Sequence, residues 1–376
     1  MLSHYIYNGK ERLRCGFTTG SCAAMAAKAA CLNYFGEDCK FSEIMTPKGV
    51  LVKSEVINAQ TGKNYSSASV IKDAGDDIDV TDKIEVNVKI EFTNEKELLL
   101  IGGKGVGVVT KKGLNQNAGE SAINSVPRKM ILEEVRAAFK KYNYENGARI
   151  IVSVPNGEEI AKRTFNPNLG IEGGISILGS SGIVEPKSLS ALKDSVYLEM
   201  KVLREEGKVS LVLTPGNYGQ LFIDECYKPL REATVKCSNF IGESLDFASL
   251  LKFENVLLIG HIGKFCKLSL GIMDTHSKVA DGRKEAFCCF ASLAGAEKEV
   301  LEKIMNSVTS IECLEILDSV NLKEKTLDLM IKSAQGYIER RAMGDFKAGI
   351  ITFDNENNII GMSNEARDIL KCFEEK

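Results

Sequence analysis

The pattern of apolar and polar residues predicts that the first half of the chain mixes strands with helices. Apolar and polar residues alternate with period two over Lys83–Ile90, and a similar alternation begins at Leu51–Lys53. This period is typical of half-buried β-strands. A further strand is expected at about 149–154, with helices at about 127–142 and 158–164. Together these elements predict an α+β domain with a mixed sheet over residues 1–187.

After Pro186 the pattern changes to apolar strands that stop at glycine turns. The run Lys208–Leu213 stops at Thr214–Gly219, and the run Asn255–Ile259 stops at Gly260–Lys264. Helical patterns surround these strands, and the chain ends in a strand at about 348–353 and a helix at about 364–373. Strand, glycine turn and helix in repetition are typical of an open parallel sheet covered by helices. Residues 188–376 are therefore expected to form a doubly wound, mostly parallel, Rossmann-like α/β domain.

A helix with very small side chains is expected near the N-terminus. The hydroxyl residues of Thr18–Ser21 precede the alanine-rich run Cys22–Ala30, and such residues cap helices well. A helix this poor in bulk lets another part of the chain approach its backbone closely.

Composition restricts the class of protein. The 376 residues are 44% hydrophobic and 26% charged, with a formal net charge of -3, as in ordinary globular proteins. This charge predicts no nucleic-acid or membrane partner. The first ten residues lack an apolar signal core, and the 11 cysteines contain no C-x-x-C pair. We therefore expect a cytoplasmic protein without a metal site of its own.

The glycine turns after the apolar strands are candidate ligand sites. Gly103–Gly107 lacks the third glycine of the dinucleotide fingerprint, and Gly260–Phe265 departs from the phosphate-loop pattern at two positions. For Gly103–Gly107, tight turns and bulges without a ligand are the favoured interpretation. However, Thr214–Gly219 and Gly260–Lys264 follow strands at the edge where open α/β sheets bind ligands. Both interpretations remain open.

Two charged segments are also candidates. Lys72–Thr81 carries four carboxylates in seven residues, but lacks the glycine and glutamate of a calcium loop. It is either a solvated turn or a set of carboxylates that bind a cation or accept a proton. The segment His261–Lys284 is basic in a slightly acidic chain and contains two of the three histidines. It forms either a patch that binds a polycarboxylate or a solvated helix face.

Eight segments, in order along the chain, resemble the motifs of one family. They are Cys15–Ala24, Lys72–Thr81, Gly102–Gly113, Asn115–Asn124, Thr164–Gly179, Thr214–Gly219, Gly260–Lys264 and Asp274–Arg283. The family is cobalt-precorrin-5B C1-methyltransferase, of the anaerobic route to cobalamin. Ser125 replaces an expected proline, and the chain beyond about residue 290 carries little of the resemblance.

The resemblance implies an enzyme that transfers the methyl group of S-adenosylmethionine to carbon 1 of cobalt-precorrin-5B, giving cobalt-precorrin-6A. Cobalt then arrives inside the polycarboxylate corrinoid substrate. Partners could include neighbouring pathway enzymes in transient contact. Two alternatives are a corrinoid carrier without methyl transfer and a small-molecule kinase, which the failed phosphate-loop spacing disfavours.

The resemblance and the strand-end argument together give three sets of candidate residues. The residues expected to handle the proton lost in the reaction are His261, Asp76 and Asp77. Those expected to bind the methyl donor are Thr214, Gly216, Asn217, Gly219, Gly260 and Gly263. Those expected to bind substrate carboxylates, through a helix start and a basic patch, are Thr18, Thr19, Ser21, Lys264, His276 and Arg283.

Overall fold

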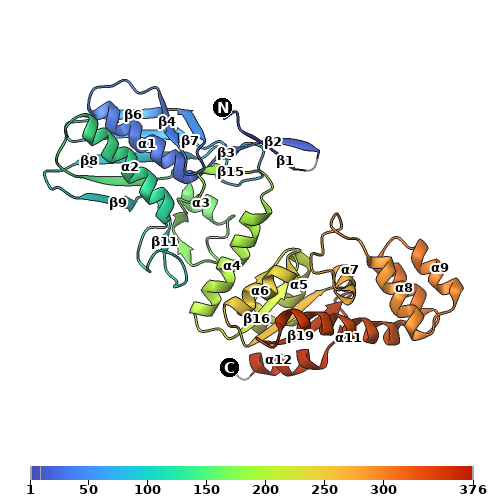
Figure 1. Ribbon diagram of the computed structural model, residues 1–376. Coiled ribbons are helices and arrows are strands. Elements are labelled where there is room, and N and C mark those ends of the chain that lie inside the picture. Colours follow the sequence, from blue (N-terminus) through green and yellow to red (C-terminus); the bar gives the residue numbers. More distant parts are fainter. Residues whose placement is uncertain (1, 9, 375–376) are drawn as a thin grey trace. The chain divides into compact units, whose positions relative to one another are not determined.

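The structure is a computed structural model that describes residues 2–8 and 10–374 (Figure 1). The chain divides into two compact units, Met1–Leu189 and Ser190–Lys376, called here the N-terminal and C-terminal units. Each unit has a five-stranded sheet that contains both parallel and antiparallel pairs. The prediction that the chain combines helices with sheets of mixed strand orientation is confirmed.

The helices and strands of the N-terminal unit are short except around its central sheet. They are β1 (Tyr5–Asn8), β2 (Glu11–Arg14), β3 (Gly16–Phe17), α1 (Thr19–Tyr34), β4 (Phe41–Met45), β5 (Leu51–Glu55), β6 (Ile57–Thr61), β7 (Tyr65–Ile71), β8 (Glu85–Phe92), β9 (Leu98–Gly102), β10 (Gly105–Val106), β11 (Val108–Val109), α2 (Ser125–Lys141), β12 (Ala148–Ser153), α3 (Gly157–Ala161), β13 (Ile171–Glu172), β14 (Gly174–Ile175) and β15 (Ile183–Val184).

The central sheet of this unit has the order β6-β7-β8-β12-β9, with β12 antiparallel to β8 and parallel to β9. Helix α1 packs on β7 and β8 and against α2 (Figure 1). A Cβ atom at Gly20 of α1 would lie 2.6 Å from Pro127 Cγ of α2, which confirms the close approach expected of this helix. Helix α2 begins at Ser125, so Pro127 lies in the first turn, where its missing N–H is not needed.

The C-terminal unit alternates strands and helices. Its elements are α4 (Leu189–Glu205), β16 (Ser210–Thr214), α5 (Asn217–Cys226), η1 (Lys228–Ala233), β17 (Thr234–Lys236), α6 (Ile241–Leu250), β18 (Asn255–His261), α7 (Ile262–Phe265), η2 (Cys266–Leu270), α8 (Arg283–Ala294), α9 (Lys298–Asn306), α10 (Ser310–Asp318), α11 (Lys323–Ala342), β19 (Lys347–Phe353), β20 (Ile359–Met362) and α12 (Asn364–Glu374).

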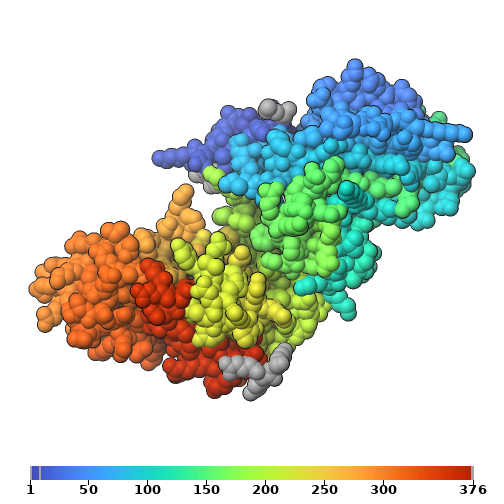
Figure 2. Space-filling view, turned by 180° about the vertical axis from the view of Figure 1, so that it is seen from behind, coloured from blue at the N-terminus to red at the C-terminus, as the bar shows by residue number. Residues whose placement is uncertain are grey.

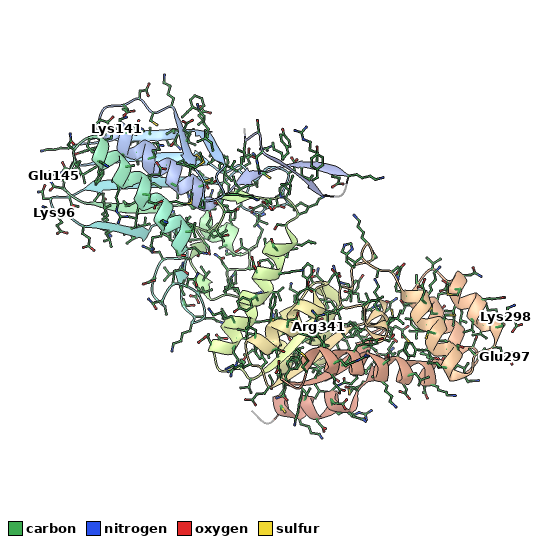
Figure 3. All side chains as sticks on the ribbon, viewed as in Figure 1. Lys96, Lys141, Glu145, Glu297, Lys298 and Arg341 are labelled. Atoms are coloured by element: carbon green, nitrogen blue, oxygen red, sulfur yellow. The ribbon has the colours of Figure 1, made fainter. Side chains whose placement is uncertain are left out.

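The sheet of this unit has the order β17-β16-β18-β19-β20, parallel except for β20. Leu211 and Leu213 point to the face covered by α4, α6 and α11, and Val212 points to the face covered by α5 and α12. Burial on both faces explains the continuous apolar runs of its strands. Arg341 of α11, labelled in Figure 3, also binds Asp246 of α6 through two hydrogen bonds of 2.8 and 2.7 Å.

Helices α8, α9 and α10 form a separate hydrophobic cluster with α7 and one end of α11. The orange segment that carries α8–α10 is a solid lobe in the space-filling view (Figure 2). The stretch before this lobe, residues 271–282, is irregular rather than helical. Across residues 2–8 and 10–374, no helix has the length and apolar character needed to cross a bilayer.

Candidate functional site

The two turns predicted to bind the methyl donor lie at one edge of the C-terminal sheet. Strands β16 and β18 are parallel neighbours, and they end at Thr214 and His261. The turns Thr214–Gly219 and Gly260–Lys264 therefore lie at the same edge of the sheet. This is the edge at which open α/β sheets bind ligands.

The first turn joins a buried hydroxyl to an uncapped helix start. Gly216 has a φ of +94°, in the left-handed region, and precedes α5 with no side chain to cap it. A Cβ atom at Gly219 would lie only 1.7 Å from Thr214 Oγ1, so the Thr214 hydroxyl packs directly against the first turn of α5. This hydroxyl is buried and has no hydrogen-bond partner among the described residues. Asn217, the first residue of α5, is exposed.

The second turn is fixed by His261. The N–H group of Gly263 donates to His261 Nδ1 at 3.0 Å and so caps α7. The other ring nitrogen, Nε2, lies 2.8 Å from Asn355 Oδ1. Because Nδ1 accepts a hydrogen bond, we assign the ring proton to Nε2, which donates to Asn355.

This arrangement engages both ring nitrogens of His261. With the ring proton on Nε2, the basic lone pair lies on Nδ1, so the histidine could accept a proton only after its hydrogen bond from Gly263 N–H is broken. Its role as a base stays a prediction. Gly260 serves packing, since a Cβ atom there would lie 2.2 Å from the ring of Phe265.

Lys264 connects the loops that follow three strands. Its side chain is half-buried, and Nζ donates to Asn239 Oδ1 at 2.9 Å and approaches Pro215 O at 3.4 Å. Thr275 Oγ1 also donates to Asn239 Oδ1, at 3.2 Å. Burial lowers the pKa of Lys264, against a smaller opposing effect of the Cys237 thiol, and Lys267 adds a still smaller lowering.

Sequence reasoning missed two amides of this site. Asn355 lies in the polar run that follows β19, so the strand-end argument applied to Thr214 and His261 could have found it. Asn239 follows β17, which has only three residues. No apolar run marks that strand in the sequence.

The predicted basic patch is largely engaged with its own chain. Lys267 is buried, with its ammonium donating to Thr275 O at 3.0 Å and Ala280 O at 2.8 Å. Arg283 pairs with Asp281 at 2.5 Å. His276 is exposed, and its Nδ1 accepts the N–H of Lys278. Substrate binding by His276 and Arg283 stays a prediction.

In the N-terminal unit, the hydroxyls at the start of α1 have partners within the protein. Thr18 Oγ1 accepts the N–H of Ser21 at 3.2 Å and caps the helix. Thr19 Oγ1 accepts the N–H of Leu178 at 2.9 Å, and Ser21 Oγ donates to Gly182 O at 2.7 Å. All three predicted substrate residues are buried. The structure therefore gives them a local structural role, and anion binding at this helix start stays a prediction.

The acidic segment folds back on the strand that precedes α1. Asp76 Oδ2 accepts the N–H of Arg14 at 2.6 Å, and Asp77 Oδ1 accepts the N–H of Lys187 at 2.9 Å. Asp73 forms a bidentate pair with the Arg14 guanidinium, at 2.6 and 2.8 Å. Hydrogen bonding from Arg14 lowers the pKa of Asp73 to about 2, against the opposing effect of burial.

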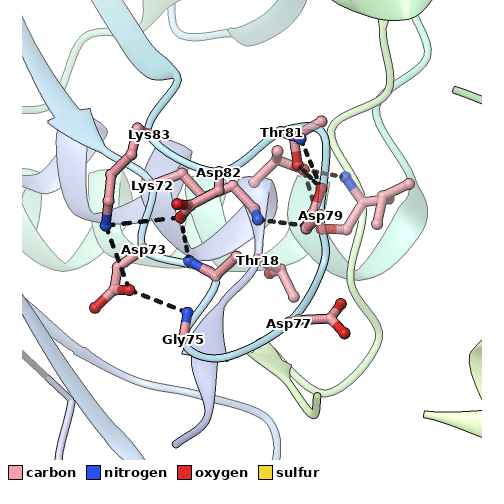
Figure 4. A network of polar contacts seen from close by, with 12 residues as sticks. Thr18, Lys72, Asp73, Gly75, Asp77, Asp79, Thr81, Asp82 and Lys83 are labelled. Atoms are coloured by element: carbon pink, nitrogen blue, oxygen red, sulfur yellow. Dashed lines mark hydrogen bonds and ion pairs between the residues drawn. The ribbon is translucent and has the colours of Figure 1, made fainter. Parts of the chain in front are cut away.

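A partly buried ion pair closes the same segment (Figure 4). Lys72 is only 2% exposed, and its Nζ donates to Asp79 Oδ2 at 2.6 Å. Asp79 Oδ1 accepts hydrogen bonds from the N–H and hydroxyl groups of Thr81. Burial raises the pKa of Asp79, but Lys72 and Thr81 lower it by more, so the net shift is downward. Proton transfer by Asp76 or Asp77 stays a prediction.

Neither the acidic segment nor the cysteines form a metal centre in the described part of the chain, where no three His, Cys, Asp or Glu side chains are placed to hold an ion.

The glycine-rich segment 102–113 forms β10 and β11, which pair with β14 and β13. A Cβ atom at Gly105 would lie 2.0 Å from Val154 O. The glycine there is needed for backbone packing.

Comparison with known proteins shows the family. A family model described as CbiD matches residues 6–186, and one described as CbiD, C-terminal domain matches residues 274–364. The chain is 43% identical over 357 residues to the cobalt-precorrin-5B C(1)-methyltransferase of Ruminiclostridium cellulolyticum, covering 95% of this chain and 93% of the relative. It is 45% identical over 318 residues to the protein of the same name from Alkaliphilus oremlandii, covering 84% and 87%.

A crystal structure of a cobalamin biosynthesis protein (cbiD) from Archaeoglobus fulgidus is also similar. It has 30% sequence identity, covers 73% of this chain and 86% of its own, and has a TM-score of 0.39. On the strength of the sequence matches, this α/β chain belongs to the CbiD family. The family resemblance identified from the eight sequence segments is confirmed.

Proposed function

We propose that this protein is a C-methyltransferase that methylates carbon 1 of cobalt-precorrin-5B, with S-adenosylmethionine as methyl donor, to give cobalt-precorrin-6A in cobalamin biosynthesis. The observation that carries the proposal is the 43% identity over 95% of the chain to a relative of that name. A second relative of that name is 45% identical over 84% of the chain.

The reaction needs alignment more than chemical groups from the protein. A substrate carbon attacks the methyl carbon of the sulfonium, a C–C bond forms, and the C–S bond breaks with its electron pair going to sulfur. The substrate also loses one proton. The protein has to hold donor and acceptor in line and exclude water. Glycine turns and fixed polar groups at a sheet edge suit this task.

We propose the C-terminal unit as a Rossmann-like domain that holds the methyl donor at the carboxyl edge of its sheet. The turns Thr214–Gly219 and Gly260–Lys264 converge there, which supports the proposal. Among the donor-binding residues, Gly216 and Asn217 leave the start of α5 accessible, and Gly263 lies at the start of α7. Thr214, Gly219 and Gly260 support the turns from within.

The corrinoid substrate carries several acetate and propionate groups, so we propose that it binds through cations and N–H donors. Lys264, His276 and Arg283 are the candidates in the C-terminal unit, and Thr18, Thr19 and Ser21 those in the N-terminal unit. His261, Asp76 and Asp77 are the candidates to take the proton. All eleven cysteines are free thiols, which fits a reaction in the reducing cytoplasm.

The test is an anaerobic incubation with cobalt-precorrin-5B and methyl-labelled S-adenosylmethionine, followed by the product's mass and label position. The proposal predicts one added methyl group with the label on carbon 1. Tight binding of the macrocycle without methyl transfer would instead identify a corrinoid carrier. Binding of neither ligand would contradict the proposal altogether.

A further inference from the structure

The half-buried ammonium of Lys264 is neutralised by no carboxylate among the described residues. Its contacts are with two neutral oxygens, Asn239 Oδ1 at 2.9 Å and Pro215 O at 3.4 Å. The charged side chain that also affects its pKa is another cation, Lys267. A partly buried cation is costly to keep without an opposite charge. The arrangement therefore suits an anion supplied by a ligand.

The start of α5 faces this ammonium. Helix α5 has 10 residues, and no side chain accepts its first N–H groups. The first N–H groups of any α-helix lack partners within the helix and carry partial positive charge. A Cβ atom at Gly216 would meet only Lys264 Nζ, at 3.8 Å. No other atom outside residues 215–217 lies within 4 Å of that position, so the ammonium and the helix start border the same unfilled side of Gly216.

The buried hydroxyl of Thr214 is an independent sign of a missing partner. It has no hydrogen bond among the described residues, and it packs against Gly219 in this same first turn. A fully buried hydroxyl without a partner destabilises a protein. A valine would fill the same space without that cost, so the hydroxyl at this position is explained by a polar atom that reaches the turn.

We propose that Lys264 and the first turn of α5, with the Thr214 hydroxyl beneath it, form a subsite for one carboxylate group of a ligand. This inference rests on the proposed function, because both proposed ligands carry carboxylates. The source is either the amino-acid part of S-adenosylmethionine or an acetate or propionate of the corrinoid. One ammonium and one helix start match a single carboxylate in charge.

The experiment compares the full-length wild type with Lys264→Gln in equilibrium binding. The probes are S-adenosylhomocysteine, 5′-methylthioadenosine, which lacks the amino-acid part, and cobalt-precorrin-5B. The control is Lys228→Gln, since Lys228 is an exposed lysine at the start of η1, just beyond the C-terminal end of α5. Loss of a charge-assisted hydrogen bond is expected to weaken binding of the carboxylate ligand about tenfold or more.

Each pattern of results has a distinct meaning. If Lys264→Gln weakens the binding of S-adenosylhomocysteine but not that of 5′-methylthioadenosine, the subsite holds the donor's carboxylate. If the substitution weakens only the binding of cobalt-precorrin-5B, the subsite holds a corrinoid carboxylate. Affinities equal to those of the wild type for all three probes would overturn the subsite while leaving the proposed function intact. A wild type that binds none of the probes would overturn the proposed function as well.

Thr214→Val provides a second variant that does not depend on Lys264. The change removes the hydroxyl from buried surroundings, so the melting temperature is expected to stay the same or rise. The ligand affected by Lys264→Gln should bind a few-fold more weakly. A Thr214→Val variant that binds this ligand as the wild type does would contradict the role of the hydroxyl, and Thr214→Ser should restore binding.

Discussion

The acidic segment Lys72–Thr81 and the strand-end turns of the C-terminal unit differ in how their polar groups are used. In the acidic segment, Asp73, Asp76 and Asp79 each bind a partner within the protein. At the strand ends, the hydroxyl of Thr214 has no partner in the described part of the chain, and the Lys264 ammonium contacts only neutral oxygens.

We infer from this difference that the acidic segment serves stability and that the strand ends serve ligand binding. A carboxylate that already accepts hydrogen bonds from its own chain gives up those bonds if it is used for a ligand. A buried donor without a partner gains a bond when a ligand arrives. Density of charged residues in the sequence is therefore a weaker sign of a binding site than unsatisfied polar groups in the fold.

The largest effect is expected from valine at the open glycines of the strand-end turns. Gly263→Val crowds His261 Nδ1, which lies 3.2 Å from the position of a Cβ atom, and Gly216→Val fills the space beside Lys264. Both variants are expected to lose binding of S-adenosylhomocysteine in calorimetry. Both should keep the folded circular dichroism spectrum, and Gly216→Val should also lower the melting temperature because valine is strained at the φ of +94°. If both bind the donor as the wild type does, the donor site lies elsewhere.

The acidic segment should instead control stability. Asp79→Ala leaves the buried Lys72 ammonium without its partner, which is expected to lower the free energy of unfolding by about 3–5 kcal/mol. Asp38→Ala is the matched control, because Asp38 belongs to an exposed pair with Lys40 and should change stability by about 0.5 kcal/mol or less. Urea denaturation measures both. A small effect of Asp79→Ala would contradict the structural role of this pair.

The pair between Arg14 and Asp73 predicts a specific loss of stability in acid. The pKa of Asp73 is lowered from 3.8 to about 2 in the folded protein. The stabilisation is fully present well above pH 3.8 and is lost as the pH falls toward the folded value. It amounts to about 2 kcal/mol.

Denaturation curves at several pH values between 5 and about 2 test this loss. Asp73→Asn cannot titrate, so its stability should fall less steeply than that of the wild type over this interval. Parallel curves for the two proteins would show that Asp73 is not stabilised by the ion pair as the structure indicates.

The smallest effect on stability is expected at His261, where two variants distinguish helix capping from proton transfer. Asparagine is also a good N-cap residue, so His261→Asn should keep most of the stability that His261→Ala loses, about 1 kcal/mol. If His261 takes the substrate's proton, His261→Asn should lower kcat while KM for the methyl donor changes little. Unchanged kcat in His261→Asn would remove the imidazole from the mechanism and leave it as a helix cap.

The sequence allows the strands and turns of the C-terminal unit to be predicted well. Strands buried on both faces have continuous apolar runs, which mark β16 and β18. Gly216 marks the turn after β16, but Gly260 lies within β18, which ends two residues later than predicted, at His261. Asn239 could not be found in this way, because β17 is too short to produce an apolar run. The cap formed by His261 depends on the backbone direction after Gly260, which no residue spacing reveals.

The acidic segment shows the limit of charge patterns. Its sequence gives no sign that Lys72 is buried while Asp76 is exposed. That difference arises because residues 73–76 pair with the backbone of Arg14–Phe17, through Phe17 N–H to Asp73 O at 2.8 Å and Asp76 N–H to Arg14 O at 2.9 Å. Tertiary packing of this kind decides which charges are available, and local composition does not encode it.

We propose that the methyl donor binds at the strand ends of the C-terminal unit. Amide hydrogen exchange of the full-length protein, with and without S-adenosylhomocysteine, tests it most directly. The account predicts slower exchange for the first turn of α5, at Asn217–Gly219, and for Gly263 and Lys264. Unchanged exchange at both turns, with protection confined to the acidic segment or to segment 102–113, would contradict it.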